Sequence, residues 1–440
     1  MSAVIKTNMS ALRTYNLLNA NQSSAQKHML KVSTGMKLNS AQDDASAYSI
    51  SERMRVRIRA LEQAHQNTQN GSSMIKTAEG AVSNILETLR TLKEKAIDAA
   101  NDSNTDEDRR IMQKEFNQFV DQIDDDALTQ FNSMYLINNS RNNAFKATWS
   151  IMSNHNLAKD TDFTTAAFSS LKTRFGESLG IKDTDTIAWS YVENGKTYHG
   201  EIKGSKTFFD LHADIGATPL SLTIFSSTGS DKVAIGDATH DYRDKFDSKL
   251  YTSQGVMFIS PTTEAKNYIS GITLQVRAAD GTVNKFANAY LKFTEENRGE
   301  SQTGDRALSF HVGAEANQAT KVALTDMRTE ALGLKGNKGN IISISTKDDA
   351  NAAISAIDTV IKKVLDEQSN IGAFLSRLEY TAANLTTSYT NDTASESVIR
   401  DADMATETAS YVKYNVLSQS AQAMLAQANQ NPRNVLSLLR

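Results

Sequence analysis

Residues 354–389 read ISAIDTVIKKVLDEQSNIGAFLSRLEYTAANLTTSY, with side chains of one row spaced alternately three and four residues apart. Gln368 is the only polar member of that row, and the pattern holds for five repeats. Such heptad spacing is typical of a helix that packs along one face against another helix. It predicts one helix roughly 50 Å long. Thr346 followed by Asp349 has the spacing of a capping box and predicts where this helix starts.

A second heptad row lies in the N-terminal part of the chain. Its members are Ile75, Ala78, Val82, Ile85, Leu89, Leu92, Ala96 and Ala99. Ser40 with Asp43 predicts the cap of an earlier helix. Thr105 with Asp108 predicts the cap of a later one. Because each apolar stripe needs a partner, we expect the N- and C-terminal stripes to pack on each other in a helical rod.

The two extreme ends of the chain have weaker patterns. Residues 1–40 hold five basic side chains and no acidic one, and both this segment and residues 404–440 mix small, polar and sparse apolar residues. Segments of this kind are marginal helices alone and order when an assembly buries them. Frayed tails are the alternative, but the apolar run at 435–439 argues against it.

The centre of the chain is different in composition. Residues 141–340 hold 17 of the 21 glycines and most of the aromatic residues, which is typical of short strands joined by turns. Asn194-Gly195 between two alternating segments predicts a β-hairpin. The elements expected here are strands at 186–192 and 196–202, a short helix at 208–215, and strands at 220–225, 272–276, 289–293 and 308–312.

Composition limits the possible functions. The 440 residues carry 47 basic and 51 acidic side chains, a net charge of −4, which argues against a surface that is basic throughout and binds nucleic acid. There is no cysteine, so disulfides and thiolate sites are excluded. No apolar run reaches the length of a membrane span, and the first 30 residues lack the apolar stretch of a signal peptide. We expect a cytoplasmic protein or one exported by an uncleaved route.

The sequence offers no credible catalytic, cofactor or metal site. No two of the seven histidines are four residues apart, and no glycine-rich phosphate loop or Gly-x-Ser-x-Gly motif occurs. The acidic residues 121, 124, 125 and 126 lack the spacing of a calcium loop, and a solvated helix face is the better interpretation. We therefore expect no cofactor, no metal and no enzyme activity.

Several motifs resemble those of the bacterial flagellin family. They are KVSTGMKLNSAQDDA at 31–45, NTQNGSS at 67–73, TAEGA at 77–81, RDADMA at 400–405, LAQANQ at 425–430 and VLSLL at 435–439. The resemblance covers about 1–140 and 305–440, in order and at both ends. Residues 141–304 match only loosely, as the variable part of the family does.

The resemblance implies an α+β protein: a long helical coiled-coil rod from paired N- and C-terminal segments, with an inserted, mostly β outer domain. The implied boundaries are 1–42 (N-terminal inner-tube helix), 43–140 (N-terminal half of the rod), 141–304 (outer domain), 305–400 (C-terminal half of the rod) and 401–440 (C-terminal inner-tube helix).

The resemblance also implies a structural subunit that is exported unfolded by the flagellar type III system and assembles into the extracellular flagellar filament used for motility. Its partners would be copies of itself, the filament cap and hook-associated proteins, and an export chaperone on the C-terminal segment, with no nucleic acid and no membrane insertion. The candidate self-assembly residues are Val4, Leu12, Leu18, Leu30, Val416, Leu425, Val435, Leu436, Leu438 and Leu439. The candidate rod-seam residues are Ile75, Val82, Ile85, Leu89, Leu92, Ile354, Ile357, Ile361, Val364, Ile371, Leu375 and Leu378.

One stretch departs from the family. The segment recognised by the animal flagellin-sensing Toll-like receptor corresponds here to residues 93–98, and Glu115 matches the acidic position of the next helix. Lys93 keeps a charge but lacks the planar fork of arginine, and Lys95 replaces an apolar anchor. Asp98 replaces an amide, whereas Glu94 is retained. These changes predict weakened receptor activation.

Two other functions remain open. The first is a hook–filament junction protein, a related adaptor with similar ends that polymerises little. The second is a flagellin whose outer domain is an enzyme or an adhesin, although no metalloprotease motif supports it.

Overall fold

The computed structural model of the chain describes residues 8–158, 165–208, 210–211, 223–226, 233–234, 243, 251–252, 256–259, 268–336 and 339–438, with side chains in the last helix described up to 430. The chain forms two compact units. The terminal unit comprises 1–69, 311–318 and 380–440, and the main unit comprises 70–310 and 319–379. No helix in the described ranges has the length and apolarity needed to cross a membrane.

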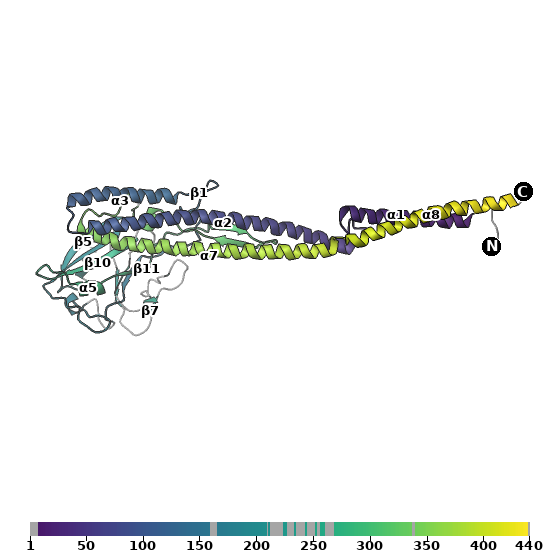
Figure 1. Cartoon of the computed structure of the whole chain (residues 1–440). Coiled ribbons are helices and arrows are strands. Elements are labelled where there is room, and N and C mark those ends of the chain that lie inside the picture. Colours follow the sequence, from purple (N-terminus) through teal and green to yellow (C-terminus); the bar gives the residue numbers. More distant parts are fainter. Residues whose placement is uncertain are drawn as a thin grey trace. The chain divides into compact units, whose positions relative to one another are not determined.

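Long helices dominate both ends of the sequence, as predicted. Helix α2 runs over Ala45–Ala99 and α7 over Lys347–Arg400, and each contributes to both units. In the main unit, α3 (Asp106–Ala127) joins them, and the three helices lie side by side (Figure 1). In the terminal unit, α1 (Met9–Thr34) packs along α8 (Met404–Leu438).

Two of the three predicted helix starts are confirmed. The side chain of Thr105 accepts a hydrogen bond from the Asp108 N–H, and the Asp108 carboxylate accepts one in return, which completes a capping box at α3. At α7, the Asp349 N–H donates to Thr346 Oγ1 at 3.2 Å.

The cap predicted at Ser40 is wrong. The Asp43 carboxylate does accept hydrogen bonds from the backbone of Asn39 and Ser40, but these close a turn in the loop before the helix. Helix α2 is capped by Asp44, whose Oδ1 accepts from the N–H groups of the second and third helical residues, both at 3.0 Å.

The main unit holds two principal antiparallel sheets. One has the order β10-β4-β5, formed by Ile269–Arg277, Thr186–Glu193 and Lys196–Lys203. The other has the order β11-β3-β9-β6, formed by Thr294–Asn297, Ile151–Asn154, Val256–Ile259 and Thr223–Ser226. Shorter pairs are β1-β2 (Gln130–Phe131, Met134–Tyr135), β12-β13 (Leu308–His311, Ala319–Val322) and β7-β8 (Val233–Ala234, Tyr251–Thr252).

The predicted hairpin is confirmed. Strands β4 and β5 pair from Thr186↔Lys203 to Glu193↔Lys196. Asn194 and Gly195 form the turn, both with positive φ (50° and 73°), which two-residue hairpins of this kind require. The tip of the hairpin meets the loop that follows the short helix α6 (Thr329–Leu332), which belongs to the same unit.

One predicted strand is wrong, and two other predictions are only partly described. Residues predicted as a strand at 289–293 begin as part of helix α5 (Lys285–Tyr290), because Asn284 caps that helix by accepting from the Ala287 N–H. Of the strand expected at 220–225, residues 223–225 lie in β6 and the rest lie outside the described residues. Most of the helix expected at 208–215 also lies outside them.

Candidate assembly surface

Helices α1 and α8 bury very little between them. In α1 the buried residues are Thr14, Leu18 and Ala25. On α8 they are Ser418, Ala421 and Ala428. Leu18 is the only large apolar side chain of the six, and small residues let two helix backbones approach closely without filling a wide core. The pair therefore satisfies only a narrow stripe of each helix.

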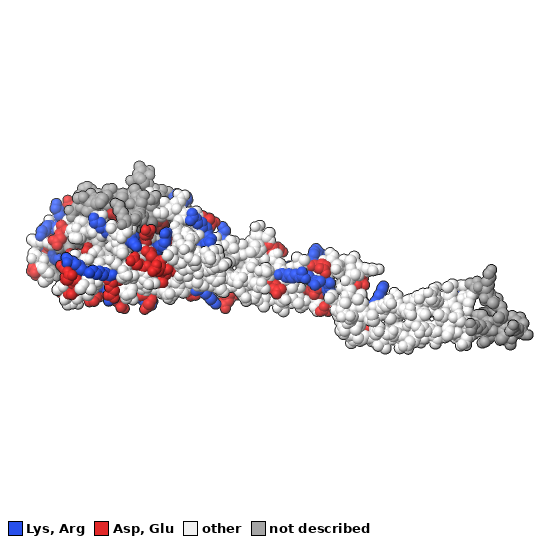
Figure 2. Space-filling view, turned by 90° about the horizontal axis from the view of Figure 1, so that it is seen from above, with Lys and Arg blue, Asp and Glu red and all other residues white. Residues whose placement is uncertain are grey.

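Many of the other apolar side chains of this pair are exposed. Leu17 is 61% exposed and Met424 is 65% exposed. Among the described side chains of the two helices, the large exposed apolar residues are Met9, Leu12, Tyr15, Leu17, Met29, Leu30, Met404, Val412, Val416, Leu417 and Met424. Figure 2 shows that the face of this pair, at the right of the view, carries almost no charged side chains. Large uncharged apolar surfaces mark sites of association.

The predicted self-assembly residues divide into three groups. Leu12, Leu30 and Val416 are at least half exposed and free for a partner. Leu18 is buried within the pair, and Leu425 is half-buried. Val4 and Leu439, and the side chains of Val435, Leu436 and Leu438, lie outside the described part of the chain. The other exposed apolar residues of the two helices were not predicted as self-assembly residues. The sequence shows only that they are apolar and lie in the same terminal segments.

A compact junction links the breaks between the terminal helices and the rod helices. Gly35 ends α1 with φ 71°, and its carbonyl accepts from the Ala402 N–H at 2.9 Å. The Lys37 N–H donates to the Arg400 carbonyl at 2.6 Å. The Arg400 guanidinium donates to Glu52 at 2.6 Å and lies over the Tyr48 ring. These contacts tie residues from the two ends of the sequence at one point.

Comparison with known proteins identifies the family. The bacterial flagellin N-terminal helical region matches residues 5–142, and the bacterial flagellin C-terminal helical region matches 354–439. A flagellin of Clostridium tyrobutyricum is 33% identical over 437 residues, which cover 97% of this chain and 99% of that protein. This chain belongs to the bacterial flagellin family.

Two other matches carry different names. The flagellar filament 30.7 kDa core protein of Treponema maltophilum is 26% identical, over 99% of each chain. The crystal structure of the flagellar hook associated protein-3 from Legionella pneumophila is 16% identical, covering 78% of this chain and 97% of that one, with a TM-score of 0.33.

In the rod of this flagellin-family chain, the predicted seam residues are buried to different extents. The five N-terminal seam residues, Ile75 to Leu92, are fully buried. On α7, four seam residues spaced by one heptad are also buried: Ile357, Val364, Ile371 and Leu378. The alternate row of Ile354, Ile361 and Leu375 is only half-buried. A second, partly open apolar row therefore follows α7 in the main unit.

The residues that correspond to the receptor-recognised segment form ion pairs within the rod. Lys93 Nζ lies 2.6 Å from Asp358 on α7, and Lys95 Nζ lies 2.8 Å from Glu115 on α3. Glu94 and Asp98 are exposed. The structure thus brings Lys95 and Glu115 together, while weakened receptor activation stays a prediction.

One cluster in the outer segment has the residue types of a hydrolytic site. Ser153 Oγ lies 2.9 Å from His155 Nε2, and Glu296 Oε1 contacts that same ring nitrogen. A catalytic relay needs the base's two partners on opposite ring nitrogens. The cluster therefore clips β3 to β11 and does not form a relay. Within the described residues, no group of three or more acidic or histidine side chains is arranged to hold a metal.

The acidic cluster on α3 has a structural role. The Asp124 carboxylate accepts hydrogen bonds from the Thr329 N–H and hydroxyl, both at 2.8 Å, at the start of α6. Lys335 lies 3.3 Å from Asp121. These contacts hold the α6 loop against α3. Part of the acidic face that was predicted to be solvated therefore makes hydrogen bonds and ion pairs with that loop.

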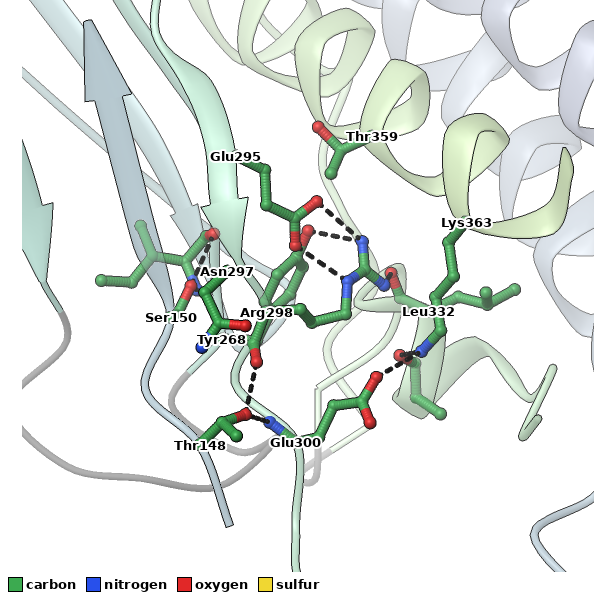
Figure 3. Close-up of polar contacts among 12 residues, drawn as sticks. Thr148, Ser150, Tyr268, Glu295, Asn297, Arg298, Glu300, Leu332, Thr359 and Lys363 are labelled. Carbon is green, nitrogen blue, oxygen red and sulfur yellow. Dashed lines mark hydrogen bonds and ion pairs between the residues drawn. The ribbon is translucent and has the colours of Figure 1, made fainter. Parts of the chain in front are cut away.

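A buried charged network joins the outer strands to the rod inside the main unit (Figure 3). Arg298, just after β11, directs its guanidinium at Glu295 (2.9 Å) and at the Tyr268 hydroxyl (2.7 Å). From α7, Lys363 donates to the Ala331 carbonyl at 3.1 Å and lies 3.9 Å from Glu300. Burial, reinforced by the nearby Arg298 charge, lowers the pKa of Lys363 to about 8.

The Lys363 amine predicts a pH-dependent stability. The folded chain releases this proton near pH 8, whereas the unfolded chain holds it to about the ordinary value of 10.5, so stability from this group rises with pH between those values. We expect the unfolding free energy of the parent to gain roughly 2 kcal/mol relative to Lys363→Met across this window. Urea unfolding followed by fluorescence of the two tryptophans, both in the main unit, measures it. A difference between the parent and Lys363→Met that stays constant with pH would contradict the prediction.

Proposed function

We propose that this chain is the structural subunit of a bacterial flagellar filament and that it associates with copies of itself through α1 and α8. The observation that carries the proposal is the set of exposed apolar side chains on these two helices, and Figure 2 shows one face of the pair nearly free of charge. Family membership supports the same conclusion.

The driving force is burial of that surface between copies. Covering a half-exposed apolar side chain contributes about 1 kcal/mol, and the two helices offer many of them. A contact between different faces of neighbouring copies does not close and generates an open helical polymer. The half-buried row on α7 supplies a further apolar strip for the same purpose. Residues 141–304 then form the outward, structural part of each subunit rather than an enzyme.

We infer the remaining roles from the resemblance to the family. The subunit is exported unfolded by the flagellar type III system and works in the extracellular filament for motility. Its partners besides its own copies are the cap and hook-associated proteins and an export chaperone on the C-terminal segment. A chain without cysteine cannot form disulfides during unfolded transit.

Seeded polymerisation tests the proposal. The full chain should form long tubes, seen by light scattering and negative-stain microscopy, whereas a chain lacking 1–40 and 404–440 should form none. A sharper variant carries Leu17→Ser, Val412→Ser and Met424→Ser, which change only exposed side chains and should slow elongation at least tenfold. Phe175→Ser, at an 82% exposed position of the main unit, is the matched control and should assemble normally.

The outcomes separate the candidate functions. A full chain that stays monomeric with proper seeds would contradict the filament subunit and favour the hook–filament junction adaptor. Normal assembly of the triple variant would show that the exposed face of α1 and α8 does not make the contact.

A further inference from the structure

The contact between α1 and α8 is poor in features that fix one alignment. Its buried positions are small or hydroxylated apart from Leu18. Helices that meet through small residues can shift by a heptad and still bury a similar area. The junction between Gly35 and Ala402 anchors one end of the pair, so a further contact within the helices themselves is needed to determine how far along α8 each residue of α1 lies.

Glu407 makes the only charged contacts that the structure gives between the described parts of these helices. Its carboxylate lies 2.5 Å from His28 Nδ1 and 3.4 Å from Lys31 Nζ. The Glu407 side chain is 14% exposed, and the two basic side chains are about a quarter exposed. One heptad further along α8, the Tyr414 ring stacks on His28 with centroids 5.3 Å apart.

The sequence makes this contact unique to one alignment. Helix α1 contains no acidic residue, and Glu407 is the only one in α8. A shift along the helix moves Glu407 away from His28 and Lys31, and α8 holds no other carboxylate to replace it. A shift of one heptad places Glu407 opposite position 21 or 35, which are asparagine and glycine.

We propose that Glu407, held between His28 and Lys31, sets the register of α1 against α8. A half-buried carboxylate that loses its partners costs far more than an exposed one, so shifted registers are disfavoured even though their apolar contacts are similar. This inference rests on the proposed function, because the register decides which exposed apolar side chains of the two helices stand together for a neighbouring copy.

The electrostatics of Glu407 agree with this role. Burial acts to raise the pKa of its carboxyl, but the hydrogen bond with His28 and the charge of Lys31 outweigh it and hold the pKa below the ordinary value. The titratable groups that face it are the His28 imidazole and the Lys31 amine, both from α1. On its own helix, Lys413 lies over the Tyr414 ring instead. The carboxylate is therefore ionised at neutral pH.

Engineered cysteine pairs measure the register directly, because the chain has no cysteine of its own. Asn8 donates to the Ala428 carbonyl at 2.8 Å, so cysteines at 8 and 428 report the native register. Pairs at 8 and 421 and at 15 and 428 report shifts of one heptad in either direction. Each pair is tested under mild oxidation in the full-length monomer and after seeding, with and without Glu407→Ala.

We expect the parent to cross-link almost only at 8–428. Glu407→Ala should raise cross-linking at a shifted pair at least fivefold and lengthen the seeded assembly lag by a similar factor. Lys413→Ala, which removes a charge from the same helix without touching α1, should behave as the parent. Exchanging the charges with Lys31→Glu and Glu407→Lys together should restore the native pair.

Two results would overturn the proposal. One is Glu407→Ala with the parent's cross-linking pattern. The other is loss of all three cross-links, which would mean that Glu407 is needed for pairing itself and not for its register. The cross-links are also read in the monomer, so the two proposals can fail separately. If the parent forms no filaments but Glu407→Ala still shifts the register, the proposed function is contradicted and the inference about Glu407 is supported.

Discussion

Gly336→Ala should destabilise the main unit by about 4 kcal/mol or more, the largest loss expected from adding a single carbon to this chain. A Cβ at Gly336 would lie 1.8 Å from the Asn194 carbonyl oxygen and 2.6 Å from its carbon. Both are backbone atoms at the tip of the β4–β5 hairpin, so no side chain can rotate away.

The contact from the hairpin side is also too close for a Cβ. Gly195 has φ +73°, and its added Cβ would lie 2.2 Å from the Asn340 carbonyl oxygen. The hairpin tip and the loop after α6 therefore interlock through two glycines, and either substitution must push the outer sheet away from the rod. Unfolding in urea, followed by tryptophan fluorescence, measures the loss.

Helical glycines provide the matched control. Gly80 in α2 and Gly372 in α7 have nothing within 4 Å of an added Cβ. Alanine there should stabilise the same unit by roughly 0.5–1 kcal/mol, because glycine loses more backbone entropy on folding. A Gly336→Ala chain as stable as these controls would show that the interlock yields at little cost.

The rod was predictable because its signal is periodic and local. A heptad row of the length seen at 354–389 is typical of a long helix, and the structure has α7 there without a break. Caps are less certain, since neighbouring residues compete for the role. Both Asp43 and Asp44 accept backbone hydrogen bonds, and only the second lies where α2 starts. The 289–293 error has a similar origin: a short apolar run does not distinguish a strand from a helix, and Asn284 decided it.

The contacts between outer strands and rod were not predictable. Tyr268, Glu295, Arg298 and Lys363 are scattered over the sequence, in four different local contexts, and no spacing connects them. The glycine interlock is equally invisible, because Gly336 has the signal of an ordinary turn. The sequence showed that the terminal helices contain apolar residues. Which of these side chains are exposed depends on how α1 packs against α8, and the sequence did not show that.

Arg298→Ala is the other substitution from which we expect a severe effect, a loss of about 3–5 kcal/mol from the main unit. The guanidinium is 10% exposed, donates to both Glu295 oxygens and the Tyr268 hydroxyl, and lies 4.3 Å from the centre of the Tyr268 ring. Removing it leaves a carboxylate that is 19% exposed without its cation, and a phenol with one partner fewer. The Arg298 guanidinium also donates to the carbonyl of Leu332 in α6 at 3.5 Å, so its removal loosens β11 from α6.

Two further variants separate the charge from its geometry. Arg298→Lys keeps the charge but cannot bond both oxygens and the phenol from one plane, so it should recover only part of the loss. Arg298→Met with Glu295→Met removes the buried charges together and should be more stable than Arg298→Ala alone, since no unpaired carboxylate remains. Arg90→Ala breaks an exposed pair with Glu87, in which both side chains are more than half exposed, and should cost less than about 1 kcal/mol. If Arg298→Ala costs no more than Arg90→Ala, the network does not hold the outer strands to the rod, and the interlocked glycines must do so alone.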